Sequence, residues 1–150
     1  MIDQSIYPLL HEWPVRERLR SFEQGCIIEC TGSQLPELAA TQLLGRNSAG
    51  WWECDLSDNS LVWTSGVYGI FGLPHGSSIT REETLALYSE DSRAKLERLR
   101  TWAISNSRGF VLDVEIRPAN GEPERIMRII ACPVLEDGSV QRLQGLKVLI

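Results

Sequence analysis

The sequence predicts an α+β domain in which helices cover one face of an antiparallel sheet, preceded by an N-terminal helical extension. Two short stretches with alternating apolar residues come first, helical patterns follow over about 65–106, and longer alternating stretches occupy 110–150. Alternation at every second residue indicates strands with one buried face, whereas apolar residues at every third or fourth position indicate helices. Strands, then helices, then a strand meander is the order typical of the α+β class.

The composition is that of one domain of ordinary size with an appendage. Of the 150 residues, 43% are hydrophobic, which is enough for a core, and the net charge is −5. This acidic balance argues against a nucleic-acid partner, which would select a basic surface. No apolar run approaches the ~18–20 residues that cross a bilayer, and no signal peptide is evident, so we expect no membrane contact.

The four cysteines, Cys26, Cys30, Cys54 and Cys132, are few and scattered. Such usage is typical of a reducing compartment, so we expect free thiols and a cytoplasmic location. Cys26 and Cys30 share a face, and we interpret them as core thiols. A redox switch is the alternative, and it requires exposed thiols with a lowered pKa. Two thiols do not complete a zinc site, which usually has four ligands, so we predict no metal.

Residues 1–47 form the predicted helical extension, and 48–150 form the predicted domain. A first helix runs from Pro14 to a left-handed stop at Gly25, and a second runs from Ser33 to Gly45. The extension has more apolar side chains than a lone helix can bury, so we predict a homodimer through these helices. The residues of this predicted contact are Leu9, Leu10, Trp13, Leu19 and Phe22.

The alternative for these apolar residues is packing on the outer face of the sheet within the same chain. That face is expected to be half-polar, since it would carry Glu115, Arg117 and Arg128.

The first part of the domain combines two strands with three helical segments. Strands are predicted at 52–56 and 60–64, and short helical turns at 65–71. Thr80 and Glu83 form a capping box for a helix from Arg81 to Tyr88. Asp91 is the expected N-cap of the longest helix, 92–106.

Three longer strands are predicted to complete the chain, at 110–117, 124–134 and 141–150. Asn120-Gly121 and Asp137-Gly138 separate them, and both dipeptides favour two-residue hairpins because their residues tolerate a positive φ.

Motifs at five places occur in one order along 50–150. The opening strand has Trp52, Asp55 and Leu56, and the strand-to-helix stretch has Trp63 and Phe71-Gly72-Leu73-Pro74. The acidic element is Tyr88-Ser89-Glu90-Asp91-Ser92-Arg93. The hairpin has Phe110, Glu115, Arg117, Asn120 and Gly121, and the last strand with its turn has Asp137-Gly138 and Gly145. Together they resemble the PAS superfamily, in the branch whose first strand reads Trp-x-x-Asp-Leu. The acidic element departs from the family's His-Pro-Glu-Asp-Arg, because Tyr88 and Ser89 replace His and Pro and Ser92 is inserted.

The resemblance implies a five-stranded antiparallel sheet of order 2-1-5-4-3 and a role in signalling. PAS modules commonly precede histidine kinases, diguanylate cyclases or transcription regulators, so we expect a sensor that binds a small ligand or a protein partner and relays a conformational change. A ligand-free adaptor for protein–protein contacts is the alternative. A small α+β enzyme is the third hypothesis, and it would need a titratable cluster in the cavity. Since no nucleophile–base pair or phosphate loop is evident, we predict no enzymatic activity.

A ligand would bind between helix and sheet, where small molecules find concave, mostly apolar sites. The residues predicted to surround it are Leu99, Ala103, Leu112, Val114, Met127 and Ile129, and the alternative is that they fill the core. No cofactor is predicted. The two histidines, His11 and His75, lie outside the long helix from which a haem-binding relative would be expected to offer its ligand, and the flavin-binding cysteine motif is absent.

Overall fold

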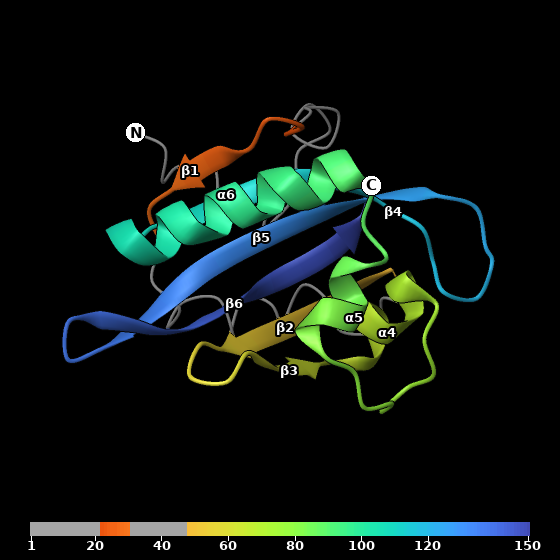
Figure 1. Ribbon diagram of the computed structural model, residues 1–150, viewed down its shortest axis with the longest axis horizontal. Coiled ribbons are helices and arrows are strands. Elements are labelled where there is room, and N and C mark those ends of the chain that lie inside the picture. Colours follow the sequence, from red (N-terminus) through yellow and green to blue (C-terminus); the bar gives the residue numbers. More distant parts are fainter. Residues whose placement is uncertain (1–21, 31–47) are drawn as a thin grey trace.

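The computed structural model describes residues 22–30 and 48–150, and the following account concerns these residues. They form a six-stranded antiparallel sheet of order β1-β4-β5-β6-β2-β3, with three helices on one face (Figure 1). The strands are β1 (Cys26–Ile28), β2 (Ala49–Asp55), β3 (Ser60–Trp63), β4 (Gly109–Ile116), β5 (Arg125–Glu136) and β6 (Ser139–Leu149).

The order of the strands from β3 to β4 is the predicted order, but the predicted number of strands is wrong. The sixth strand, β1, pairs with β4 at the edge of the sheet, with Cys26 opposite Val111 and Ile28 opposite Gly109. β1 lies in the segment that we assigned to the helical extension. A strand of three residues is too short to show alternation, and its partner lies far away in the sequence, so only tertiary pairing reveals it.

The helices are α4 (Ser65–Phe71), α5 (Arg81–Leu85) and α6 (Glu90–Asn106). Helix α6 lies along β4 and β5, and α4 and α5 lie on the same face toward β2 and β3 (Figure 1). The Thr80–Glu83 capping box of α5 is confirmed. None of the described helices is long and apolar enough to cross a membrane.

Two helix boundaries differ from the predictions. Helix α6 begins two residues earlier than expected, because the Ser89 side chain accepts the Ser92 N–H at 3.2 Å. The expected cap, Asp91, instead lies in the first turn and pairs with Lys95. Helix α5 ends at Leu85, since Tyr88 turns toward the sheet and forms a bridge with Ile116.

The two predicted hairpins have different outcomes. Asp137 and Gly138 both have positive φ, 53° and 81°, and join β5 to β6 in a tight turn, as predicted. Asn120-Gly121 instead lies in a longer loop, because β4 ends at Ile116 and β5 begins at Arg125. Pro118 and Pro123 fall in this loop. Neither can donate a ladder hydrogen bond, so the strands separate before the turn.

Both faces of the sheet are buried. On the helix side a large cluster includes Trp52, Trp63, Phe71, Phe110 and Leu112. On the other side a smaller cluster contains Phe22, Ile28, Val111, Ile130, Cys132, Leu146 and Val148, with Ala49. Phe22 therefore lies on the outer face of the sheet. The other residues of the predicted dimer contact lie outside the described residues, and the dimer stays a prediction.

The expectation of a half-polar outer face is wrong for Arg128. Its side chain is fully buried, and its Nε and Nη2 donate to the Asp113 carboxylate at 2.7 and 2.9 Å. The Phe22 ring stacks 4.4 Å from the guanidinium, and the Phe22 N–H donates to Asp113. Arg128 faces outward from the sheet but is buried, because Asp113 of β4 pairs with it and Phe22 covers it. Glu115 and Arg117 are exposed, as expected.

The expectation of free thiols is also wrong for one pair, because Cys30 and Cys132 form a disulfide across 102 residues of sequence. Cys30 follows β1 and Cys132 lies on β5, so the bond passes over β4. It can do so because Gly109 has no side chain: a Cβ there would lie 2.6 Å from the Cys30 sulfur. Cys26 and Cys54 are free, so the pairing of Cys26 with Cys30 as core thiols is corrected as well.

Candidate functional site

A buried lysine distinguishes the helix-covered face of the sheet. Lys147 lies on β6, where it is opposite Ile129 of β5 and Gly50 of β2, and only 7% of its surface is exposed. Its neighbours on the same face of β6 are Leu143, Gly145 and Leu149. The alternation of the strand therefore directs the lysine into the core, where an apolar side chain would be expected.

Aromatic rings surround the Lys147 ammonium group. Its Nζ lies 5.0 Å from the ring of Trp52, 5.6 Å from that of Trp63 and 5.2 Å from that of Phe71. Trp63 and Phe71 stack with their centroids 5.0 Å apart. Such π faces attract a cation, by about 2 kcal/mol or more when water is excluded. We call Trp52, Trp63 and Phe71 the aromatic cage.

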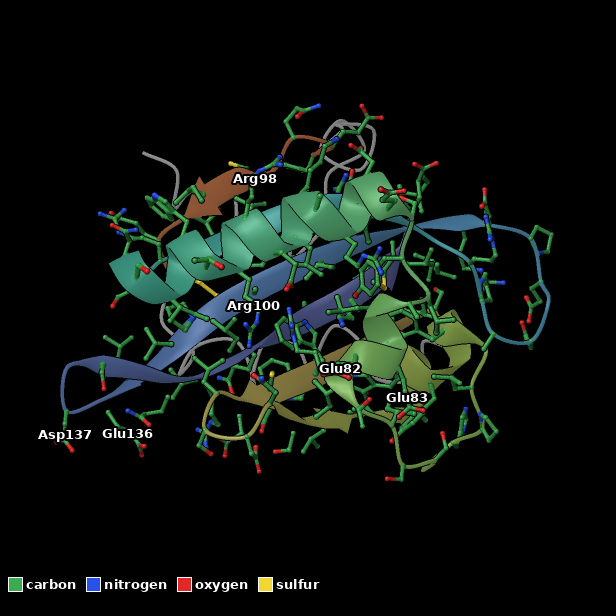
Figure 2. The ribbon with its side chains drawn as sticks, viewed as in Figure 1. Glu82, Glu83, Arg98, Arg100, Glu136 and Asp137 are labelled. Atoms are coloured by element: carbon green, nitrogen blue, oxygen red, sulfur yellow. A yellow bond between two sulfur atoms is a disulfide. The ribbon has the colours of Figure 1, made fainter. Side chains whose placement is uncertain are left out.

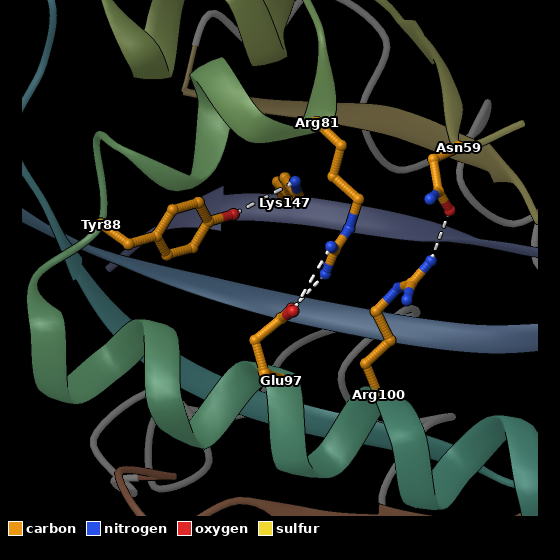
Figure 3. Close-up of polar contacts among 6 residues, drawn as sticks. All are labelled: Asn59, Arg81, Tyr88, Glu97, Arg100 and Lys147. Carbon is orange, nitrogen blue, oxygen red and sulfur yellow. Dashed lines mark hydrogen bonds and ion pairs between the residues drawn. The ribbon is translucent and has the colours of Figure 1, made fainter.

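Among the described residues, the polar contact of this lysine is with a tyrosine hydroxyl. Lys147 Nζ donates to Tyr88 Oη at 3.4 Å (Figure 3), and no carboxylate among the described residues forms an ion pair with it. Tyr88 is itself buried and sits between α5 and α6. An unpaired ammonium in such a place is costly, so it tends to lose its proton.

Burial shifts the pKa values of Lys147 and Tyr88 in opposite directions, because it disfavours the charged form of each. Burial lowers the pKa of Lys147 to about 7; Cys54 acts in the opposite direction, and the Arg81 charge lowers the pKa further. Burial also raises the pKa of the Tyr88 hydroxyl. Near neutral pH the site thus holds a lysine that is in large part a neutral amine beside a protonated phenol.

A small cavity of about 50 Å³ adjoins the lysine, between the sheet and helices α5 and α6. Its surface is mainly apolar, with a few polar groups. It is lined by Trp52, Cys54, Leu61, Arg81, Thr84, Leu85, Tyr88, Leu96, Arg100, Phe110, Ile129, Leu143 and Lys147.

Two polar bridges connect the elements around this cavity (Figure 3). Arg81 of α5 pairs with Glu97 of α6, and Arg100 of α6 donates to Asn59, in the turn between β2 and β3, at 2.9 Å. In Figure 2 Arg100 points from α6 toward the strands, whereas Glu136 and Asp137 lie far from it at the tip of the β5–β6 hairpin. The bridges hold α6 to the elements on the opposite side of the cavity.

The predicted ligand-binding residues are distributed unevenly around this cavity. Ile129 lines it. Ala103, Leu112, Val114 and Met127 are buried in the helix-side cluster, and Leu99 is half-buried against that cluster. That these six residues bind a ligand stays a prediction.

Sequence reasoning missed Lys147, Tyr88 and the cage. One signal was available: Lys147 interrupts the apolar alternation of the last strand at an inward-facing position. Tyr88 had no such signal, because its burial depends on where α5 ends.

Other candidates for a functional site have less support than the surroundings of Lys147. His75 is exposed, with its ring 6.2 Å from that of Tyr68, and the described residues contain no cluster of three or more metal-ligating side chains. A second hollow of about 250 Å³ is lined by parts of 86–90 and 115–118 with Glu124. Its charged residues, Glu90, Glu115, Arg117 and Glu124, are all exposed, and its buried polar side chain, Tyr88, already contacts Lys147.

Comparisons with known proteins support a fold and no more. No protein-family model and no curated protein matches the sequence. Among solved structures, the N-terminal domain of a diguanylate cyclase with a PAS/PAC sensor from Marinobacter aquaeolei is 16% identical, with a TM-score of 0.61; the match covers 67% of this chain and 94% of that one. A sensory box histidine kinase/response regulator from Burkholderia thailandensis is 18% identical, with a TM-score of 0.59 and coverage of 76% and 82%.

A third match is an RNA-binding light-oxygen-voltage receptor, 17% identical with a TM-score of 0.60; it covers 68% of this chain but only 29% of the receptor. In this chain the fold is the antiparallel sheet with helices on one face. The chain therefore has the PAS/LOV fold, as these three solved structures do.

Proposed function

We propose that the chain is a PAS-type sensory module that binds a small, largely apolar ligand in the cavity beside Lys147. The observation that carries the proposal is the juxtaposition of a small, mainly apolar cavity with one buried amine and one buried phenol. Ligand sites combine apolar walls with a few placed polar groups, and this cavity has that composition. Of the predicted ligand-binding residues, Ile129 lines this cavity, and the other five lie in or against the helix-side cluster.

The size of the cavity restricts the ligand. About 50 Å³ is far below the roughly 300–1,000 Å³ of sites for drug-sized molecules. A cavity needs about 10–15 Å³ for each water-sized occupant, so this one fits a ligand of about three to five non-hydrogen atoms. The proposal is thus a sensor of a small metabolite, and the space does not suit a group as large as a flavin.

The relay would run through α5 and α6. A ligand bound beside Tyr88 and Lys147 would contact both helices, which the Arg81–Glu97 pair connects. Two packings of these helices with different ligand affinities would then differ in population when ligand is present. By analogy with the named histidine kinase and diguanylate cyclase, we infer an effector of kinase, cyclase or transcription-regulator type.

A homodimer through the N-terminal apolar residues Leu9, Leu10, Trp13 and Leu19 belongs to the same proposal, whereas Phe22, the fifth residue of the predicted contact, is buried against the sheet of its own chain. Such a contact would transmit the repacking between chains. Sedimentation equilibrium tests it, and a monomer at high protein concentration would remove the dimer from the proposal while leaving the ligand site intact.

The enzyme hypothesis requires a titratable cluster in the cavity, and Lys147, Tyr88 and Cys54 all line it. No carboxylate or histidine, the groups that most often transfer protons in catalysis, is among the described residues that line it. The arrangement therefore favours binding over multiple-turnover catalysis.

The test is a fragment screen by ligand-observed NMR on the full chain, using molecules of three to five non-hydrogen atoms. Leu85→Trp fills the cavity from α5, and Leu135→Trp adds the same volume at an exposed position on the β5–β6 hairpin. We expect binding to the wild type and to Leu135→Trp, and loss of binding in Leu85→Trp. If no fragment binds the wild type, or if Leu85→Trp binds equally well, the ligand site is rejected and the ligand-free adaptor becomes the better hypothesis.

A further inference from the structure

We propose that Lys147 is a covalent, reversible binding site for short aliphatic aldehydes, which it captures as an imine. The proposal rests on the proposed function, since it names the ligand class of the same cavity. Packing does not account for an amine at this position, because a methionine would fill similar space without the cost of desolvating a charge. The geometry accounts for an amine at this position if the amine nitrogen reacts with a ligand in the cavity.

The surroundings of the nitrogen suit this chemistry. Lys147 is enclosed by the aromatic cage and borders an apolar cavity, and its Nζ contacts only one polar group, the Tyr88 hydroxyl at 3.4 Å. An ion pair would hold the nitrogen as an unreactive ammonium, and the part of the chain that the structure describes provides none. The lowered pKa, about 7, supplies neutral amine at physiological pH.

The reaction balances without a redox partner. The Nζ lone pair attacks the aldehyde carbon, the carbonyl π electrons move to oxygen, and a proton passes from nitrogen to that oxygen to give a carbinolamine. The hydroxyl then leaves as water with the remaining nitrogen-bound proton, and a C=N bond forms. Tyr88 is a positioning residue, since its hydroxyl contacts Nζ and is kept protonated by burial, so it can hydrogen-bond the departing oxygen.

The electrostatics favour an aldehyde over an anionic ligand or a carbamate. The faces of Trp52, Trp63 and Phe71 carry partial negative charge, so they stabilise a cation such as a protonated imine and repel an anion. The cationic groups near the cavity are already engaged, Arg81 with Glu97 and Arg100 with Asn59. The size limit of about three to five non-hydrogen atoms selects aldehydes such as propanal or butanal.

The groups that face Lys147 from the surrounding elements set the pH response. They are Cys54 on β2, Arg81 on α5 with its partner Glu97 on α6, Arg100 on α6, and Tyr88 between these helices. Cys54 is the one competing nucleophile in the lining, so the experiment must distinguish it.

The chain offers its own control, because Lys95 and Lys147 are its only lysines. Lys95 lies on α6, where its ammonium pairs with Asp91 at 3.1 Å. The full chain is incubated with butanal and sodium cyanoborohydride, which reduces an imine to a stable amine, and is then digested and mapped by mass spectrometry. We expect modification at Lys147 to be at least about tenfold faster than at Lys95, with a rate that rises as pH passes through about 7.

Three further measurements test whether the product is specific to Lys147 in the folded chain. In urea, both lysines should react at similar rates, because the selectivity comes from the fold. Lys147→Arg should abolish the selective product, and Lys95→Arg should leave it unchanged. Imine formation in the folded wild type should also change the tryptophan fluorescence, since two tryptophans contact the nitrogen.

Butan-1-ol separates this proposal from the proposed function. It has the size of butanal but cannot form an imine. If butanal and butan-1-ol both bind in the cavity by NMR and no adduct forms at Lys147, the imine is rejected and the ligand site stands. If neither binds, both proposals fail. An adduct on Cys54, or equal rates at Lys95 and Lys147 in the folded chain, would also reject the imine.

Discussion

At the scale of single residues, Lys147 gives the protein a pH-dependent stability that can be predicted with its sign. Its pKa of about 7 in the folded chain lies below the ~10.4 of an unfolded lysine. Between these values the unfolded chain holds a proton that the folded chain has released, so the free energy of unfolding rises with pH. Below about pH 7 both states are protonated, and the folded state bears the full cost of the buried charge.

The measurement compares the wild type with Lys147→Met, a similarly sized apolar replacement, by urea unfolding at several pH values between 7 and 9.5. All other titrating groups are common to both proteins. We expect Lys147→Met to be more stable at pH 7, and its advantage to shrink by about 1.4 kcal/mol for each pH unit. Parallel curves for the two proteins would show that the buried amine does not release its proton.

A second buried charge, Arg128, is stabilised by a partner. The guanidinium donates to both oxygens of Asp113 under the Phe22 ring. We expect Arg128→Ala to lower the free energy of unfolding by about 3–5 kcal/mol, because it leaves a carboxylate without its buried partner. The control is Arg117→Ala, which breaks the exposed Arg117–Glu124 pair and should cost less than about 1 kcal/mol. Chemical denaturation measures both, and equal losses would contradict the assignment.

At the scale of elements, the short helix α5 depends on its N-terminal cap. Thr80 accepts the Glu83 N–H, and the Glu83 side chain accepts the Thr80 N–H in return. Since α5 has only five residues, little else within the helix satisfies these donors. The helix also supplies Arg81, Thr84 and Leu85 to the cavity, so its cap supports the site.

We expect Thr80→Ala to lower the free energy of unfolding by about 0.5–2 kcal/mol. It should also weaken binding of any cavity ligand, because α5 frays at the end that carries Arg81. Thr101→Ala, at an exposed position inside α6, is the matched control and should be neutral or slightly stabilising, since alanine favours helices. Thermal unfolding measures the stabilities, and a Thr80→Ala protein as stable as Thr101→Ala would show that the capping box contributes nothing.

At the scale of the whole molecule, the Cys30–Cys132 disulfide connects the edge strand β1 to the centre of the sheet. It closes a loop of 102 residues that contains most of the described elements. A cross-link over such a length restricts the unfolded chain, and its removal from a domain of this size typically costs about 2–5 kcal/mol. The fold is therefore expected to be less stable in a reducing medium.

Unfolding with and without a thiol reductant tests this expectation. The wild type should lose about 2–5 kcal/mol on reduction. The double variant Cys30→Ala with Cys132→Ala should match the reduced wild type and show no further response, and Cys26→Ala should retain the response because Cys26 is free. A wild type that is indifferent to reductant would show that the two sulfurs are not bonded in solution.

The local parts of this description were accessible from the sequence. The strand alternations, the Thr80–Glu83 capping box and the Asp137-Gly138 turn depend on neighbours within a few residues, and they occur as predicted. The order of five strands followed from the motif resemblance. The Asn120-Gly121 hairpin failed although its local signal is strong, because flanking prolines remove donors that the pairing would need.

Within 48–150 the sequence by itself determined which segments become strands and helices, because periodicity and caps act over one or two turns of chain. Tertiary structure alone decided three features: the pairing of β1 with β4, the Cys30–Cys132 bond, and the enclosure of Lys147 by Trp52, Trp63, Phe71 and Tyr88. Each joins residues tens of positions apart. Desolvation, which lowers the pKa of Lys147, depends on everything that surrounds a group in space, and no stretch of neighbouring residues encodes it.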